Sequence, residues 1–185
     1  MRHAHVEPDD DGPEAKLRNL LGAVAVAIAD EIHAEADRAA GHTAAGPAAL
    51  TALVIHRGAS VDKLAHVLGL SHSGTVRLVD RLERDGLVRR HPGSDARAVS
   101  LQLTPQGERR ATGIAGSRAT VADEFLSGLD VDERRELKRL LEKLVVTGME
   151  DWPAVQHRCR LCDLVACHAD GEPCPLDRHM AALAG

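Results

Sequence analysis

The chain has 185 residues, and 44% of them are apolar, yet it contains one Phe, one Trp and no Tyr. A core with so few aromatic side chains has to be built from Leu, Val, Ile and Ala, which favours helices packed at close range. The longest apolar run, residues 20–29, is too short to span a bilayer. The acidic residues 1–14 also lack the basic start and apolar stretch of a signal peptide. We therefore expect a soluble, cytoplasmic protein.

Charge is distributed unevenly along the chain. The formal net charge is −5, but residues 57–110 hold ten Lys and Arg against six Asp and Glu. This segment is therefore four charges positive, and the rest of the chain is nine negative. One basic segment in an acidic chain is typical of a localised phosphate-binding face. Chance charge patterning on solvated helices is the alternative explanation.

The first part of the chain predicts a disordered tail over residues 1–14, followed by two helices. From Leu17 to Ile32 the apolar residues follow the 3.6-residue spacing of a helix. Because much of this helix is apolar all round, we expect it to be buried, with a second subunit as one candidate partner. Residues 41–47 break it, and a second helix follows with Pro47 in its first turn.

The next region predicts a short helix, a tight turn, a second helix and a β-hairpin. Ser60 and Ser71 can cap the two helices. In such an arrangement the first helix braces the second, whose polar start enters the major groove, while the hairpin reaches the neighbouring minor groove or backbone. The segment therefore predicts DNA binding. The expected boundaries are 47–56, 61–68 and 72–85 for helices and 87–91 and 98–103 for strands.

The remainder predicts a long helical region, a capped helix and a separate extension. Thr104 and Pro105 open a region of weak helical character that runs to about residue 129, with two glycines in its interior. Asp130 and Glu133 form a capping-box pattern ahead of a helix over residues 133–147, which has a stripe of Leu. Beyond residue 148 the chain changes character and carries every cysteine.

Three stretches of the central region form a specific pattern: residues 64–71 (LAHVLGLS), 76–88 (VRLVDRLERDGLV) and 95–107 (DARAVSLQLTPQG). This pattern resembles the MarR family of winged helix-turn-helix regulators. The resemblance implies a mainly α-helical fold with a small β-hairpin wing and intertwined terminal helices. It also implies a homodimer that binds a near-palindromic operator in double-stranded DNA, usually as a repressor released by a small ligand. The domains expected are a tail (1–14), a winged-helix domain with dimerisation helices (15–148) and a cysteine-rich extension (149–185).

The resemblance further implies which residues contact DNA. Residues at the start of the second helix would face the major groove. In the wing, Arg97 would enter the minor groove while Asp95 orients its guanidinium group. Arg81 belongs to the same helix, although a surface ion pair with neighbouring Asp or Glu is its alternative role. The full predicted set is Ser71, His72, Ser73, Thr75, Arg77, Arg81, Asp95 and Arg97.

The cysteines are clustered in the extension, spaced Cys159-x2-Cys162-x4-Cys167-x6-Cys174. Clustered thiols in an otherwise cysteine-free chain favour a metal site over a disulfide framework. Four thiolates complete the tetrahedron of a structural zinc site. An iron–sulphur cluster and a metal-free thiol switch are the alternatives. Nearby histidines that can replace a cysteine ligand are His157, His168 and His179.

Two further questions follow from the extension. A site at the end of a dimerisation helix can couple metal or redox state to operator affinity, or it can merely hold the tail in place. A winged helix can also serve as a protein–protein interaction module, with a zinc-stapled tail as its partner surface. We do not expect an enzyme, because no nucleophile triad, Gly-rich phosphate loop or paired-carboxylate motif stands out.

Overall fold

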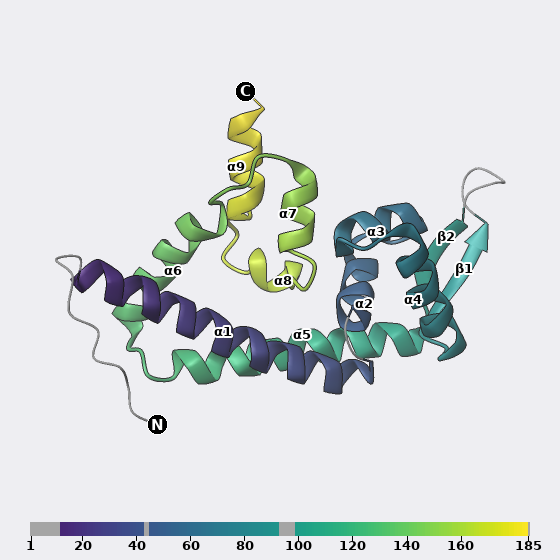
Figure 1. Cartoon of the computed structure of the whole chain (residues 1–185), viewed down its shortest axis with the longest axis horizontal. Helices are drawn as coiled ribbons and strands as arrows, with labels where there is room; N and C mark the ends of the chain where they lie inside the picture. The colour runs from purple at the N-terminus through teal and green to yellow at the C-terminus, as the bar shows by residue number, and fades with distance from the viewer. Residues whose placement is uncertain (1–11, 43–44, 93–98, 185) are drawn as a thin grey trace.

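The computed structural model describes residues 12–42, 45–92 and 99–184. Two long helices, α1 (Gly12–Ala40) and α5 (Pro105–Leu126), lie side by side and form an elongated base (Figure 1). A winged-helix domain stands at one end of this base. From the other end α6 leads into the cysteine-bearing extension, which stands over the middle (Figure 1). None of the described helices is long and apolar enough to cross a membrane.

Helix α1 begins earlier than expected and is largely exposed. Residues 12–14, assigned to the tail by the sequence, already form its first turn, where Pro13 is well tolerated. Only Ala36 and Ala40 are buried. The expected burial of this helix therefore does not occur within one chain. Its exposed large apolar side chains are Leu17, Leu20, Leu21, Val24 and Val26.

The winged-helix elements lie within one residue of their predicted boundaries. The two strands pair antiparallel, with Val88 opposite Leu103 and Pro92 opposite Val99. Both predicted helix caps are present, since the Ser60 hydroxyl accepts a hydrogen bond from the Lys63 amide and the Ser71 hydroxyl accepts one from the Gly74 amide, each at 3.1 Å. The elements are α2 (Gly46–Ile55), α3 (Val61–Leu68), α4 (His72–Arg84), β1 (Val88–Pro92) and β2 (Val99–Leu103).

One hydrophobic core joins the winged helix to the two long helices. It includes side chains from α1, α2, α3, α4, both strands and α5. Burial of aliphatic side chains on this scale is the main stabilising contribution in a core that contains no Phe, Tyr or Trp. The large side chains that are fully buried in it include Leu50, Leu53, Leu64, Leu82, Leu101 and Ile114.

Helix α5 is continuous, although its two interior glycines predicted only weak helical character. Its buried face, which includes Ile114 and Val121, packs along α1, and this tertiary packing outweighs the low helix propensity of glycine. The start of α5 is fixed to the wing. The Thr104 hydroxyl donates to the Gly86 carbonyl at 2.6 Å and caps the helix by accepting from the Gly107 amide at 3.1 Å.

Helix α6 (Val131–Val145) begins with the predicted capping box between Asp130 and Glu133. None of its residues is buried, and Leu140, Leu141 and Leu144 are exposed. The extension that follows contains three short helices that the sequence analysis did not predict. They are α7 (Trp152–Arg158), α8 (Leu164–Cys167) and α9 (Pro175–Leu183).

Candidate nucleic-acid interface

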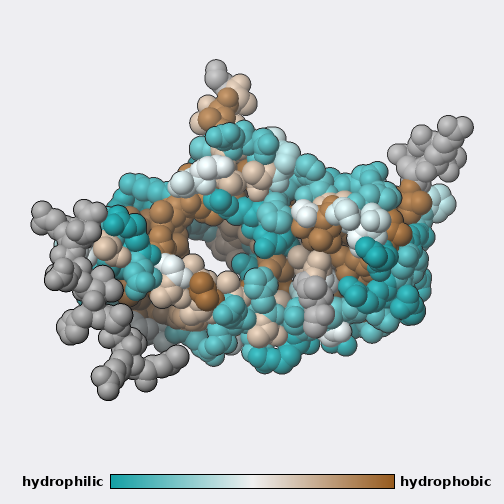
Figure 2. Space-filling view, in the orientation of Figure 1, coloured by the Kyte–Doolittle hydropathy of each residue, from teal (hydrophilic) through white to brown (hydrophobic). Residues whose placement is uncertain are grey.

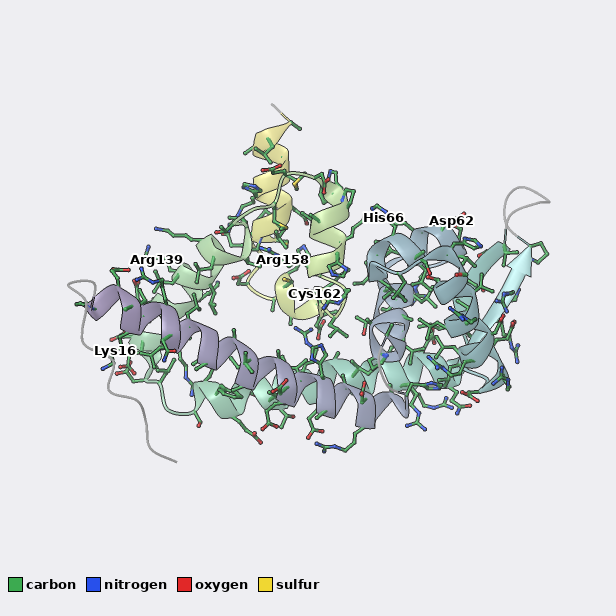
Figure 3. All side chains as sticks on the ribbon, viewed as in Figure 1. Lys16, Asp62, His66, Arg139, Arg158 and Cys162 are labelled. Atoms are coloured by element: carbon green, nitrogen blue, oxygen red, sulfur yellow. The ribbon has the colours of Figure 1, made fainter. Side chains whose placement is uncertain are left out.

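The first turn of α4 presents small polar groups to solvent. Ser71, His72 and Ser73 are exposed, and Ser71 caps the helix. His72 Nδ1 lies 2.6 Å from Asp62 Oδ1 and so ties the start of α4 to the start of α3, where Figure 3 labels Asp62. The backbone of this turn therefore lies at an accessible, pre-ordered surface, as major-groove contact requires.

Thr75 does not belong to this surface, so its assignment as a DNA contact is wrong. Its side chain is 0% exposed and its hydroxyl donates to the Ser71 carbonyl at 3.0 Å. Thr75 stands three, four and seven residues before Leu78, Val79 and Leu82, and these four residues form the buried stripe of α4. The helical spacing contained this signal, but the polar side chain suggested the opposite face.

Three arginines extend the polar surface along α4. Arg77, Arg81 and Arg84 are spaced four and three residues apart, so they lie on one side of the helix, and all three are exposed. None of them forms an ion pair within the described part of the chain. The ion pair considered for Arg81 is thus not present there, and the α4 face carries unneutralised positive charge.

Arg90 explains why the acidic residues of α4 do not neutralise this face. From β1 its guanidinium reaches Asp80 at 2.6 Å and also pairs with Glu83, whose carboxylate accepts the Arg90 backbone amide at 3.1 Å. The bridge fixes the base of the wing to α4. Sequence reasoning missed this role, because the partners are seven and ten residues away along the chain.

The predicted wing residues Asp95 and Arg97 lie outside the described residues, so their expected minor-groove contact stays a prediction. At the described base of the wing, Arg89 and His91 are exposed on β1. Arg89 stands opposite Gln102, and His91 opposite Ser100, in the antiparallel pair. Positive charge therefore continues from α4 onto the first strand of the wing.

The four cysteines stand at helix ends in the extension. Cys159 follows α7, Cys162 lies in the next turn, Cys167 ends α8 and Cys174 is the N-cap of α9. All four are free thiols, and all four line one cleft of about 480 Å³ between α5, α6 and the extension. Cys162, labelled in Figure 3, lies at the base of the extension.

The thiols form a row of neighbouring pairs. The Cys162 and Cys167 sulfurs are 3.7 Å apart. A hydrogen bond from Cys162 lowers the pKa of Cys159, and the same bond together with burial raises the pKa of Cys162. Burial and the neighbouring Cys162 thiol raise the pKa of Cys167 to about 12. Among the described residues, no group of three or more His, Cys, Asp or Glu side chains is already arranged as metal ligands are.

The three histidines considered as alternative ligands each bind a backbone carbonyl. His168 Nδ1 is 2.8 Å from the Leu164 oxygen, and His179 Nε2 is 2.8 Å from the Met149 oxygen. His157 Nδ1 lies 3.1 Å from the oxygen of Val67, in α3. One ring nitrogen of each histidine is thereby committed as a donor.

The extension also contacts the helix-turn-helix directly, which the sequence did not indicate. Helix α7 packs against α3, where the Lys63 ammonium donates to the Gln156 side-chain oxygen at 2.7 Å. Leu161 packs against the main hydrophobic core, and its carbonyl accepts a hydrogen bond from Arg118 of α5. The cysteine cluster is therefore physically linked to the helix that supports α4.

Both the sequence and the fold of this chain are similar to those of known proteins. The sequence model of the MarR family matches residues 47–98, which run from α2 into the wing. The fold is similar to that of the YusO protein from Bacillus subtilis, at a TM-score of 0.64 and 23% identity over 76% of this chain and 100% of that one. A MarR family protein from Bacillus stearothermophilus matches at a TM-score of 0.60 and 26% identity, covering 74% and 96% of the two chains.

A mutant of S. aureus MepR bound to an oligodeoxyribonucleotide also shares the fold, at a TM-score of 0.57 and 19% identity, covering 71% of this chain and 96% of that one. The family match ends in the wing, so it does not include the cysteine-rich extension. Regulators of this family are generally non-enzymatic transcription factors. The winged helix of this chain therefore matches the MarR family model over residues 47–98, and the fold is similar to that of a solved MarR family protein.

Proposed function

We propose that this protein is a sequence-specific DNA-binding transcription regulator, most simply a repressor. The observation that carries the proposal is the exposed face of α4, where a polar first turn is followed by Arg77, Arg81 and Arg84 without ion-pair partners among the described residues. Small polar groups and free guanidinium groups are the side chains that contact base edges and phosphates. MepR, which shares this fold, was crystallised with an oligodeoxyribonucleotide.

We propose that the regulator acts as a homodimer on a near-palindromic operator. Exposed apolar residues lie on α1 and on α6, and Figure 2 shows hydrophobic surface over α6 along the hollow at the centre of the molecule. Apolar stripes of this length on two helices are unusual for a monomer and favour burial against a second copy. A two-fold dimer places two α4 helices on two half-sites.

A small ligand is a further part of the proposal. The family resemblance predicts an effector between the winged domain and the dimerisation helices. A cleft of about 330 Å³ lies where α2 and β2 meet the first turn of α5, and its lining includes Leu53, Arg57, Leu103 and Glu108. A ligand that binds one arrangement of the two DNA-reading heads better than another would shift operator affinity.

The test is DNA binding by the purified full-length protein. Operator sequences are selected from a random duplex pool, and affinity is followed by fluorescence anisotropy over a range of salt concentrations. We expect a near-palindromic site whose affinity falls steeply with salt, because phosphate contacts release counterions. Arg77→Ala is expected to weaken binding about tenfold.

The matched control is Arg139→Ala, which removes the same charge from α6, at the other end of the molecule from α4 (Figure 3). It is expected to leave operator affinity unchanged. A protein that selects no duplex, or binds all duplexes alike with equal losses in both variants, would contradict the proposal. Salt-insensitive capture of a protein partner in its place would indicate an interaction module.

A further inference from the structure

We propose that Cys159, Cys162, Cys167 and Cys174 bind one Zn²⁺ ion with four thiolates, and that this site fastens the extension to α3. The cysteines occupy the ends of α7, α8 and α9 and the turn after α7. A hydrogen bond from the Cys162 amide to the Cys159 carbonyl, at 2.7 Å, closes that turn. A Cys-x2-Cys turn of this kind presents two thiolates to one ion.

The sulfur separation fits a single ion. With a Zn–S bond of about 2.3 Å, two sulfurs of a tetrahedral site stand about 3.8 Å apart. The observed distance between the Cys162 and Cys167 sulfurs is 3.7 Å, far longer than a disulfide bond. The thiolates of a four-iron cluster each bind a different iron, so they stand farther apart than two ligands on one ion.

Binding of one ion by all four thiolates requires some cysteine side chains to rotate. The described thiols are arranged as pairs, and no three of them yet share a common centre. A change of χ1 rotamer moves a cysteine sulfur by about 3 Å with no movement of the backbone. Cys159 and Cys174 line the same cleft as the central pair of Cys162 and Cys167. We infer that rotation of these side chains brings the four sulfurs to one ion.

Arg118 provides a second, independent observation. Its Nε–H is buried and has no acceptor within the described part of the chain, an uncommon state for a charged group. The side chain lines the same cleft as the four cysteines and acts electrostatically on Cys162. Zn²⁺ with four thiolates carries a net charge of −2. The guanidinium of Arg118 would offset part of that charge and donate to a ligand sulfur.

The extension also needs a stabilising interaction beyond its own hydrophobic core. Its own core consists of Met149, Val155, Cys174, Leu176 and Met180, which is small for a unit of this length. Units below about 40 residues usually require disulfides, a metal or docking on a larger body. Here the proposed metal site and the docking contact are adjacent, because Cys159 directly follows the helix whose Gln156 and His157 bind α3.

Metal content is the first test. Untagged full-length protein, purified with reductant and without chelator, is expected to contain about one zinc ion per chain by mass spectrometry. Co²⁺ in place of zinc is expected to give the visible bands of a tetrahedral ion and sulfur-to-cobalt charge transfer. Cys162→Ser and Cys167→Ser are each expected to lower zinc content at least tenfold. The control His168→Gln, in the same loop region, should keep full zinc content.

Three results would overturn the zinc site. They are iron with acid-labile sulfide, a disulfide between any two of the four cysteines in freshly purified protein, and a wild-type protein that binds neither zinc nor Co²⁺ in a tetrahedral site. The cobalt spectrum of the wild type decides the question even if a cysteine variant fails to fold.

Hydrogen–deuterium exchange tests the fastening to α3. Removing zinc with a chelator is expected to speed exchange at least tenfold in both α7 and α3, while the buried stretch of α5 stays protected. Faster exchange confined to the extension would show that the site does not hold α3. Neither measurement uses DNA, so failure of the zinc site and failure of the proposed regulatory function are seen separately.

Discussion

The winged helix and the cysteine extension are both built from short helices, but they are held together by different means. In the winged helix, α2, α3, α4 and the strands bury a continuous set of aliphatic side chains, and α3 and α4 each start at a serine cap. In the extension, α7, α8 and α9 surround a small core that includes two methionines and a cysteine. Hydrophobic burial is sufficient to stabilise the winged helix, but it is marginal for the stability of the extension.

The difference shows where each region is vulnerable. The core of the winged helix is already complete. Its stability is therefore most sensitive to substitutions at the few points where backbone segments lie in close contact. The extension depends on its attachments: α7 on α3, and ion pairs of α6 with the chain around α9, such as Arg178 with Glu142. Its stability is therefore a property of the whole molecule.

The largest effect is expected at the junction of the wing and α5. A Cβ atom at Gly107 would lie 2.1 Å from the Leu87 carbonyl oxygen, which is backbone and cannot rotate away. Gly107→Ala should therefore lower the free energy of unfolding by about 3 kcal/mol. Urea denaturation at one fixed protein concentration measures this change, since a dimer's stability depends on concentration.

Gly116→Ala is the matched control in the same helix. Nothing lies within 4 Å of the added Cβ, so the higher helix propensity of alanine should raise stability by about 0.5–1 kcal/mol. Equal unfolding midpoints for the two variants would contradict the close contact between Gly107 and the wing.

A smaller effect is expected where the extension is attached. Leu161→Ala removes the side chain that packs from the extension against the main core, and it should cost about 2 kcal/mol because Leu161 is only partly buried. Limited proteolysis should then cut first between α7 and α8. Leu164→Ala, at a position 45% exposed, should change stability by less than about 0.5 kcal/mol. Cleavage that starts in the winged helix instead would mean that the extension is not the weaker region.

The winged helix was predictable because its signals are local. Ser60, Ser71 and Thr104 are caps that act on amides three residues away, and the alternation of Val99, Leu101 and Leu103 marks a strand within five residues. The capping box of Asp130 and Glu133 is equally local. Such signals do not depend on the rest of the fold.

The features that the sequence did not predict depend on contacts between residues far apart in the chain. The pairing of Arg90 with Asp80 and Glu83, the docking of Gln156 on Lys63 and the continuity of α5 all arise from packing that no short window contains. The helices of the extension are four to nine residues long, too short for periodicity to be detected.

A third effect, smaller than those at Gly107 and Leu161, concerns the corrected role of Thr75. Its buried hydroxyl binds the Ser71 carbonyl, so Thr75→Val should cost about 1 kcal/mol of stability through the lost hydrogen bond. Because the side chain does not reach the surface of α4, operator affinity and sequence preference should stay the same. Ser73→Ala, at an exposed site two residues earlier, should do the reverse, leaving stability unchanged and weakening operator binding. A change in the sequence that Thr75→Val selects from a duplex pool would contradict this assignment. It would mean that α4 rotates on binding DNA and that Thr75 then belongs to the exposed face of the helix.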